Sequence, residues 1–147
     1  MNNLKTEDRI IGGNMSLSGD IAKHSLERLT LGYVVVVAKQ PTALLSSVRK
    51  QWLHILHQLE NRRAASTDAV KIAEYSTQIA RMQQATFSAN PLDDTWAHVN
   101  FATADQLLLF APACQTMYVA TPTDTETLHK ITSFMPEGGE VVIYKTA

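Results

Sequence analysis

The segment HILHQLE, residues 54–60, places two histidines and a glutamate at every third position. Imidazole and carboxylate groups bind Zn²⁺, and residues three apart lie on neighbouring turns of a helix. On a helical wheel, however, His54 and His57 fall opposite the apolar residues of this segment, and Lys50 falls on the same strip. An ammonium group there opposes the charge of a bound cation. We therefore predict no metal site and interpret the segment as the polar side of a helix.

Threonines occur near the start of three predicted helices, each of which follows a predicted strand. Backbone N–H groups at a helix N-terminus can hold an anion, and open parallel sheets bind ligands beyond the carboxyl ends of their strands. Lys39, at the end of an apolar strand, would add a positive charge. No glycine-rich phosphate-binding motif occurs, and the threonines could equally act only as helix caps. The candidate ligand-binding residues are Lys39, Thr42, Thr103, Asp105, Thr121 and Thr123.

The sequence indicates no catalytic set. Cys114 is the only cysteine, and no local signature links it to His98 or His129. A lone thiol of this kind is usually inert, and a single cysteine excludes an internal disulfide and favours a reducing compartment. Asp93 and Asp94 lie in a polar loop and are interpreted as solvated. We predict neither a catalytic residue nor a cofactor.

The composition is that of a globular protein, with 147 residues of which 45% are hydrophobic and 18% charged. That length is typical of one domain. The first twenty residues contain no apolar run long enough for a signal peptide, and the apolar stretch at residues 31–38 is too short to span a membrane. The sequence therefore predicts a cytoplasmic protein with no membrane partner.

The order of predicted elements indicates an α/β fold. Residues 1–17 are predicted to form a flexible N-terminal arm, and residues 18–147 a single α/β domain. The run LGYVVVVAK at residues 31–39 is typical of a strand that is covered on both faces. Further strands are predicted at 96–103, 115–121 and 140–145, and capping signals in TADQ and TDTE predict helices between them. This alternation predicts a four-stranded, mostly parallel sheet with flanking helices.

A long antiparallel helical hairpin is predicted at about residues 41–87, inserted after the first strand. Pro41 suits the first position of a helix. Apolar residues then recur at spacings of three and four in two successive segments that share a short polar connection. The two seams consist of Leu45, Val48, Trp52, Ile55 and Leu59, and of Ile72, Tyr75, Ile79 and Met82.

The apolar stripe of the first hairpin helix is wider than one antiparallel partner needs, because Leu44, Leu53 and Leu56 lie beside the seam. The sheet or another subunit could supply the second contact. We predict a homo-oligomer or another protein partner, with an interface formed by Val48, Trp52, Ile55, Leu56, Tyr75 and Ile79.

Charge is unevenly distributed along the chain. Residues 45–87 hold six basic and three acidic residues, whereas residues 88–147 hold two basic and seven acidic ones. The asymmetry permits head-to-tail attraction between copies, or a basic hairpin face that contacts nucleic acid. The residues of that face would be Arg49, Lys50, Arg62, Arg63 and Arg81.

These observations favour three functional hypotheses. The first is a non-enzymatic protein-interaction module that self-associates through its hairpin. The second is a protein or enzyme that binds a nucleotide or another small anionic ligand at the carboxyl edge of the sheet. The third is a nucleic-acid-associated accessory protein that uses the basic hairpin face.

Overall fold

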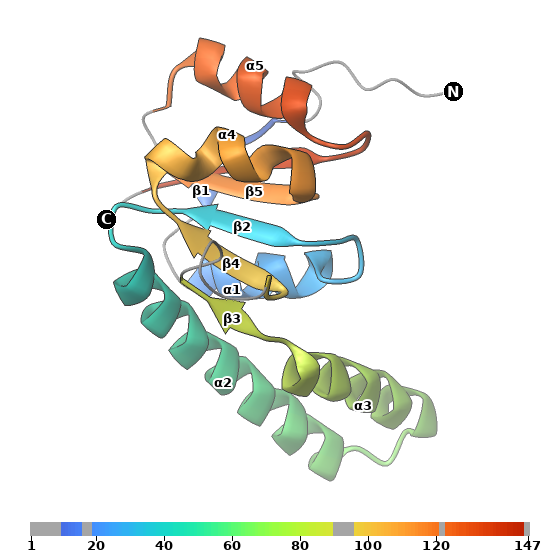
Figure 1. Ribbon diagram of the computed structural model, residues 1–147. Coiled ribbons are helices and arrows are strands. Elements are labelled where there is room, and N and C mark those ends of the chain that lie inside the picture. Colours follow the sequence, from blue (N-terminus) through green and yellow to red (C-terminus); the bar gives the residue numbers. More distant parts are fainter. Residues whose placement is uncertain (1–9, 16–18, 90–95, 121–122, 146–147) are drawn as a thin grey trace.

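A six-stranded parallel sheet forms the centre of the computed structural model, which describes residues 10–15, 19–89, 96–120 and 123–145 (Figure 1). The strand order is β1-β6-β5-β2-β4-β3, and every pairing is parallel. The strands are β1 (Ile10–Met15), β2 (Val34–Val37), β3 (Phe87–Ser88), β4 (Val99–Ala102), β5 (Thr116–Ala120) and β6 (Glu140–Tyr144). The α/β class and the parallel sheet are therefore confirmed.

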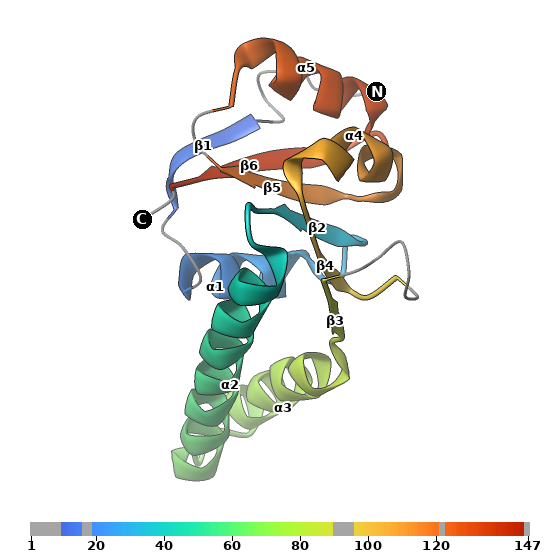
Figure 2. The ribbon, with the colours of Figure 1, turned by 60° about the vertical axis from the view of Figure 1, so that its left-hand side comes forward.

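Helices cover both faces of this sheet (Figure 2). One face packs against α1 (Gly19–Arg28), α2 (Pro41–Ala65) and the C-terminal part of α3 (Ala69–Gln84). The other packs against α4 (Leu107–Phe110), which lies between the short 3₁₀ turns η2 (Ala104–Gln106) and η3 (Ala111–Ala113), and against α5 (Thr125–Phe134). None of the described helices is long and apolar enough to cross a membrane.

The central strand β2 shows why a continuous β-branched run fits this position. All four of its valines are buried. Val34 and Val36 belong to the core beneath α1 and α2, whereas Val35 and Val37 belong to the core beneath α4 and α5. Because successive side chains point to opposite faces of a strand, a strand buried on both faces needs apolar residues at every position.

Helices α2 and α3 are joined by residues 66–68 and contact each other. Pro41 stands in the first turn of α2, as predicted. The Asp68 carboxylate caps α3 by accepting a hydrogen bond from the Val70 N–H at 2.9 Å. The helices run past the edge of the sheet at β3, so that their connected ends project from the molecule (Figure 2).

The predicted strand count of four was wrong. Residues 1–17 were predicted to be a flexible arm, but Ile10–Met15 form β1, which pairs with β6. The remainder of that arm lies outside the described residues. Strand β3 was also missed, because its two residues are too few to show a pattern. The helical pair consequently follows the second strand of the chain, not the first.

The predicted capping box in TDTE is also corrected. The side chain of Asp124, not Thr123, caps α5 by accepting from the Thr127 N–H at 2.6 Å. The Thr123 hydroxyl instead donates to the Ala120 carbonyl at 2.6 Å. A carboxylate is the stronger acceptor at a helix N-terminus because its charge also interacts with the helix dipole.

Candidate functional site: the strand-end cleft

Strands β2 and β5 separate at their carboxyl ends. Their pairing stops at Val36 and Tyr118, whereas β5 continues to pair with β6 as far as Ala120 and Tyr144. After β2 the chain enters α2 on one face of the sheet, and after β5 it leads to α5 on the other face. Adjacent strands whose connections leave on opposite faces create the crevice where open α/β sheets bind ligands.

A cleft with a volume of about 340 Å³ lies at this position. Such a volume is within the range of small-molecule sites, which is roughly 300–1,000 Å³. Its walls come from the end of β2, the first two turns of α2, and the ends of β5 and β6, and are mainly apolar. We name this feature the strand-end cleft; its lining residues are Ala38, Lys39, Gln40, Ala43, Leu44, Ser47, Ala120 and Tyr144.

The mouth of the strand-end cleft is electropositive. Lys39 is exposed there, and the 25-residue helix α2 begins beside it with no acidic residue in its first turn. Gln40 is the N-cap residue, but its side chain makes no capping hydrogen bond. Because Pro41 has no N–H and the Leu44 N–H bonds to the Gln40 carbonyl, the Thr42 and Ala43 N–H groups remain for a ligand. An anionic group is therefore favoured at this end of α2.

Tyr144, at the end of β6, lines the strand-end cleft. Its hydroxyl donates to the Val37 carbonyl at 2.6 Å, where β2 and β5 no longer pair. Burial raises the pKa of the Tyr144 phenol to about 12, so that this hydroxyl keeps its proton at neutral pH. Tyr144 therefore links the end of β6 to the end of β2 and lines the cleft between them.

The structure brings only part of the predicted ligand-binding set together. Lys39 lines the strand-end cleft, and Thr42 stands in the adjoining first turn of α2. Thr103 and Asp105 do not line it; their side chains hydrogen-bond to each other after β4. Thr123 bonds to Ala120, which does line the cleft. Thr121 lies outside the described residues.

Sequence reasoning missed Ser47 and Tyr144, which also line the strand-end cleft. Ser47 lies two turns into α2, and Tyr144 ends a strand whose position beside β5 depends on the strand order. The available signal was that Tyr144 lies near the end of the last predicted strand, residues 140–145, just as Lys39 ends the first predicted strand, residues 31–39. In a parallel sheet both positions lie at the same edge.

Comparison with known proteins gives no further guide. No protein family, curated protein or solved structure matches this chain. The function is therefore inferred from the geometry of the described residues.

The predicted interface residues pack mainly inside the chain. Val48, Trp52 and Ile79 have exposed fractions of 0%, 3% and 3%, and belong to the core beneath α1 and α2. Ile55, Leu56 and Tyr75 are half-buried against the same core. The prediction is corrected for the three buried residues, because α1, α3 and the sheet already supply the second contact that the wide apolar stripe required.

The predicted basic residues do not form one continuous stripe. The Arg49 guanidinium lies 5.9 Å from the centre of the Phe87 ring, beside a groove between α2 and β3. Arg81 borders a different pocket, next to His98 and the end of α1. Arg63 donates to the Ser76 hydroxyl at 3.5 Å, while Lys50 and Arg62 are exposed on α2. Contact with nucleic acid stays a prediction that these positions do not strengthen.

The histidine segment and the cysteine occupy different environments. His54 and His57 are exposed on α2, and the His54 ring contacts the Gln58 amide at 3.2 Å. Within the described residues no three His, Cys, Asp or Glu side chains are grouped closely enough to hold a metal ion. Cys114 is fully buried, and burial raises the pKa of its thiol to about 12. That thiol is therefore neutral and shielded from solvent in the folded protein.

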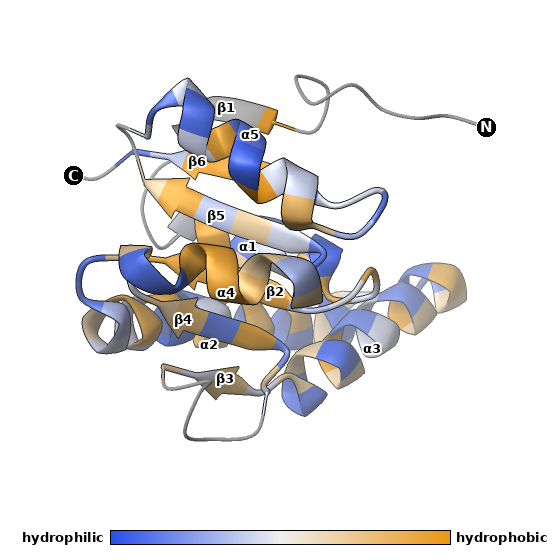
Figure 3. Cartoon of the chain, turned by 45° about the horizontal axis from the view of Figure 1, so that its top comes forward, coloured by the Kyte–Doolittle hydropathy of each residue, from blue (hydrophilic) through white to orange (hydrophobic). Residues whose placement is uncertain are grey.

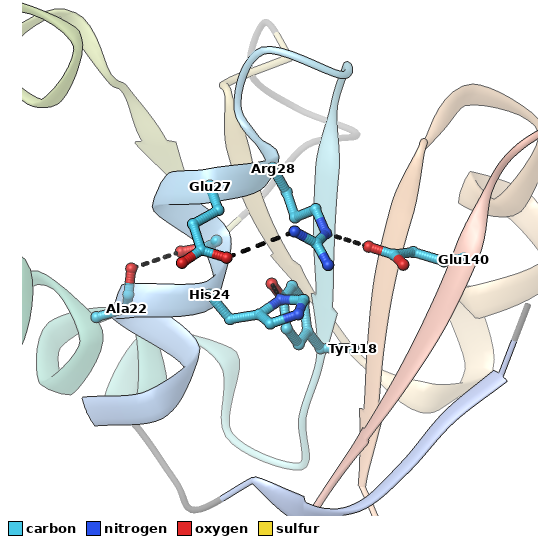
Figure 4. Close-up of polar contacts among 7 residues, drawn as sticks. Ala22, His24, Glu27, Arg28, Tyr118 and Glu140 are labelled. Carbon is cyan, nitrogen blue, oxygen red and sulfur yellow. Dashed lines mark hydrogen bonds and ion pairs between the residues drawn. The ribbon is translucent and has the colours of Figure 1, made fainter. Parts of the chain in front are cut away.

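A polar cluster ties α1 to the sheet on the side of β5 and β6 (Figure 4). The His24 Nδ1 atom lies 2.5 Å from the Tyr118 hydroxyl, and their rings meet edge to face with centres 5.5 Å apart. Arg28 pairs with Glu140 at the start of β6 and with Glu27, 3.6 Å away on α1. Burial raises the pKa of Tyr118, so its protonated hydroxyl can donate to a neutral imidazole.

This cluster predicts a loss of stability in mild acid. Burial and then the Arg28 guanidinium lower the pKa of His24 below its ordinary value of 6.5. The unfolded chain therefore takes up a proton at His24 before the folded chain does, and the stabilising effect falls as the pH drops below about 6.5. The free energy of unfolding, measured in urea at about pH 8 and pH 5.5, should fall more for the parent than for His24→Gln. Equal losses would contradict this assignment.

Proposed function

We propose that the chain binds a small anionic ligand with an apolar body in the strand-end cleft. The observation that carries the proposal is the cleft itself, which opens where β2 and β5 separate. Lys39 and the free N–H groups at the start of α2 favour a phosphate or carboxylate at its mouth. Its apolar walls, which include Leu44 and Ala120, favour a ring or chain attached to that group.

The residues that line the cleft support ligand binding without catalysis. The ionisable groups among the described residues of the cleft wall are Lys39 and Tyr144. The Tyr144 hydroxyl donates to the Val37 carbonyl and its pKa is raised, so it is poorly placed to act as a base. A lysine at the mouth of a cleft is suited to attracting and holding an anion.

A thermal-shift screen with nucleoside monophosphates, phosphorylated metabolites and aromatic carboxylates tests the proposal. A ligand at 100 times its dissociation constant should stabilise the fold by about 2.7 kcal/mol. Lys39→Glu should weaken binding at least about tenfold, because it replaces attraction of the anion with repulsion. Lys50→Glu, which changes an exposed lysine farther along α2, is the matched control and should leave the affinity unchanged. Equal losses in both variants, or no stabilisation by any compound, would contradict the proposal.

A second candidate function is protein interaction through the helical pair of α2 and α3. The observation that favours it is Leu53, a leucine with 51% of its surface exposed on α2. Leu53 stands beside a groove of about 280 Å³ whose lining includes Leu56 and Phe87. Exposed apolar surface next to a preformed groove is typical of interaction sites. This candidate retains the predicted self-association but moves it from the buried seam to the outer side of the helical pair.

A further inference from the structure

The groove on the helical pair has an apolar floor and a positive rim. Trp52 and Met82 form its base, each 3% exposed, and the half-buried Phe87 forms part of its wall. Arg49 lies over the Phe87 ring and forms no ion pair with any described carboxylate. We name this feature the α2–β3 groove; its lining residues are Arg49, Trp52, Leu53, Leu56, Met82, Gln83, Ala85 and Phe87. The lining contains a cation and no anion, so an apolar partner segment that carries a carboxylate would fit it.

Such a segment occurs on the opposite face of the same molecule. Helix α4 exposes Leu108 and Leu109, with exposed fractions of 38% and 60%, next to the exposed Asp105 in the preceding turn. Figure 3 shows the apolar part of α4 lying in front of the sheet, away from α2 and α3. Residues 96–120 contain no lysine or arginine, so Asp105 gives this surface a negative charge. We name Asp105, Leu108 and Leu109 the α4 patch.

We propose that the α4 patch of one copy docks into the α2–β3 groove of a second copy. The two surfaces carry opposite charges. The exposed leucines of the α4 patch also match the apolar floor of the α2–β3 groove. They lie on opposite faces of the sheet, so the contact is heterologous and joins copies head to tail. This inference rests on the second candidate function and names its partner.

The uneven distribution of charge along the chain supports the same head-to-tail arrangement. Residues 45–87, which include the groove, hold six basic and three acidic residues, and residues 88–147 hold two basic and seven acidic ones. Copies approaching head to tail therefore attract each other, whereas copies meeting groove to groove bring Arg49 against Arg49. Because the attraction is between exposed charges, association should weaken as salt is added.

Sedimentation velocity of the full chain, from tens to hundreds of micromolar, tests this proposal. The weight-average mass of the parent should rise with concentration. Leu53→Glu places a negative charge in the groove, and Leu109→Glu places one in the α4 patch. Each substitution should weaken association at least about tenfold. Mixed in equal amounts, the two variants should form a species of twice the chain mass and no larger, because each retains the surface that the other lacks. Val70→Glu, at an exposed apolar residue outside the groove, should associate like the parent.

The results for the parent, the single variants and the mixture distinguish the ways in which the proposal could fail. If the parent stays monomeric at every concentration, the head-to-tail contact is overturned, and so is the self-associating form of the second candidate function. Association that is lost with Leu53→Glu but kept with Leu109→Glu retains the groove as an interface and overturns the α4 patch as its occupant. A mixture that stays monomeric while the parent associates overturns the heterologous contact. If a glutamate variant fails to fold, Arg49→Glu should weaken association and the added Asp105→Arg should restore it; no restoration overturns the pairing.

Discussion

Replacing Trp52 with alanine is expected to destabilise the protein by about 3–5 kcal/mol, the usual cost of removing a large aromatic side chain from a core. Trp52 is 3% exposed, and its ring meets the Phe87 ring edge to face at 5.3 Å. Its indole N–H donates at 3.3 Å to the carbonyl of Met82, near the C-terminus of α3. One side chain thus joins both long helices to the edge of the sheet. Urea denaturation followed by circular dichroism would measure the loss.

Leu53→Ala is the matched control for this prediction. Leu53 is the next residue on the same helix but is 51% exposed, so its truncation should change the free energy of unfolding by only about 0.5 kcal/mol. A similar loss in both variants would mean that α2 is not packed with Trp52 inward, and the position of the α2–β3 groove would then be wrong as well.

The second large effect is expected at Asn100, a fully buried asparagine in β4. Its amide group donates to the Val34 carbonyl at 3.3 Å and to the Ala97 carbonyl at 2.8 Å, and its oxygen accepts from the Ala97 N–H at 3.0 Å. Asn100→Asp removes both donors and places a carboxylate against two carbonyl oxygens in the core. The expected destabilisation at neutral pH is about 3–5 kcal/mol.

Asn61→Asp makes the same chemical change at an exposed position of α2 and should cost no more than about 0.5 kcal/mol. The prediction is tested by comparing the free energies of unfolding of the two variants under identical conditions. A stable Asn100→Asp variant would show that the amide does not bridge β2 and the turn before β4. The result also bears on the strand-end cleft, because Asn100 bonds to β2, and the residues that follow β2 line that cleft.

The parts of the fold that could be predicted from the sequence are those with a strong local pattern. The spacing of Val48, Trp52 and Leu59 predicted which side of α2 is buried, and Pro41 predicted where that helix begins. The four consecutive valines predicted a strand covered on both faces. In each case residues close in sequence carry the signal, so one segment is enough to reveal it.

Other parts depended on contacts between distant segments. Strand β1 contains Gly12 and Gly13, which weaken any strand pattern, and it forms by pairing with β6 at the other end of the chain. Likewise, the same pattern that predicts a buried seam cannot say whether a second subunit or the chain's own sheet covers it. For Val48 and Ile79 the chain's own core does so.

The candidate site was predicted in part for the same reason. Lys39 follows a strand that the sequence marks clearly, so the edge of the sheet on which it lies could be predicted. Its neighbours Ala120 and Tyr144 come from β5 and β6, and only the strand order places them beside it. Threonines 103 and 123 have the right local pattern but use their hydroxyl groups within their own turns.

The most direct test of ligand binding in the strand-end cleft is an NMR titration of the isotopically labelled chain. Inorganic phosphate and a nucleoside monophosphate would be added separately while the backbone amide signals are followed. We predict that the nucleotide shifts the amides of Thr42, Ala43 and Ala120 most, that phosphate alone shifts only those of Thr42 and Ala43, and that Lys39→Glu removes both responses. No response to either compound, or shifts confined to the region of Arg62 and Arg63, would contradict the assignment of the cleft as an anion-binding site.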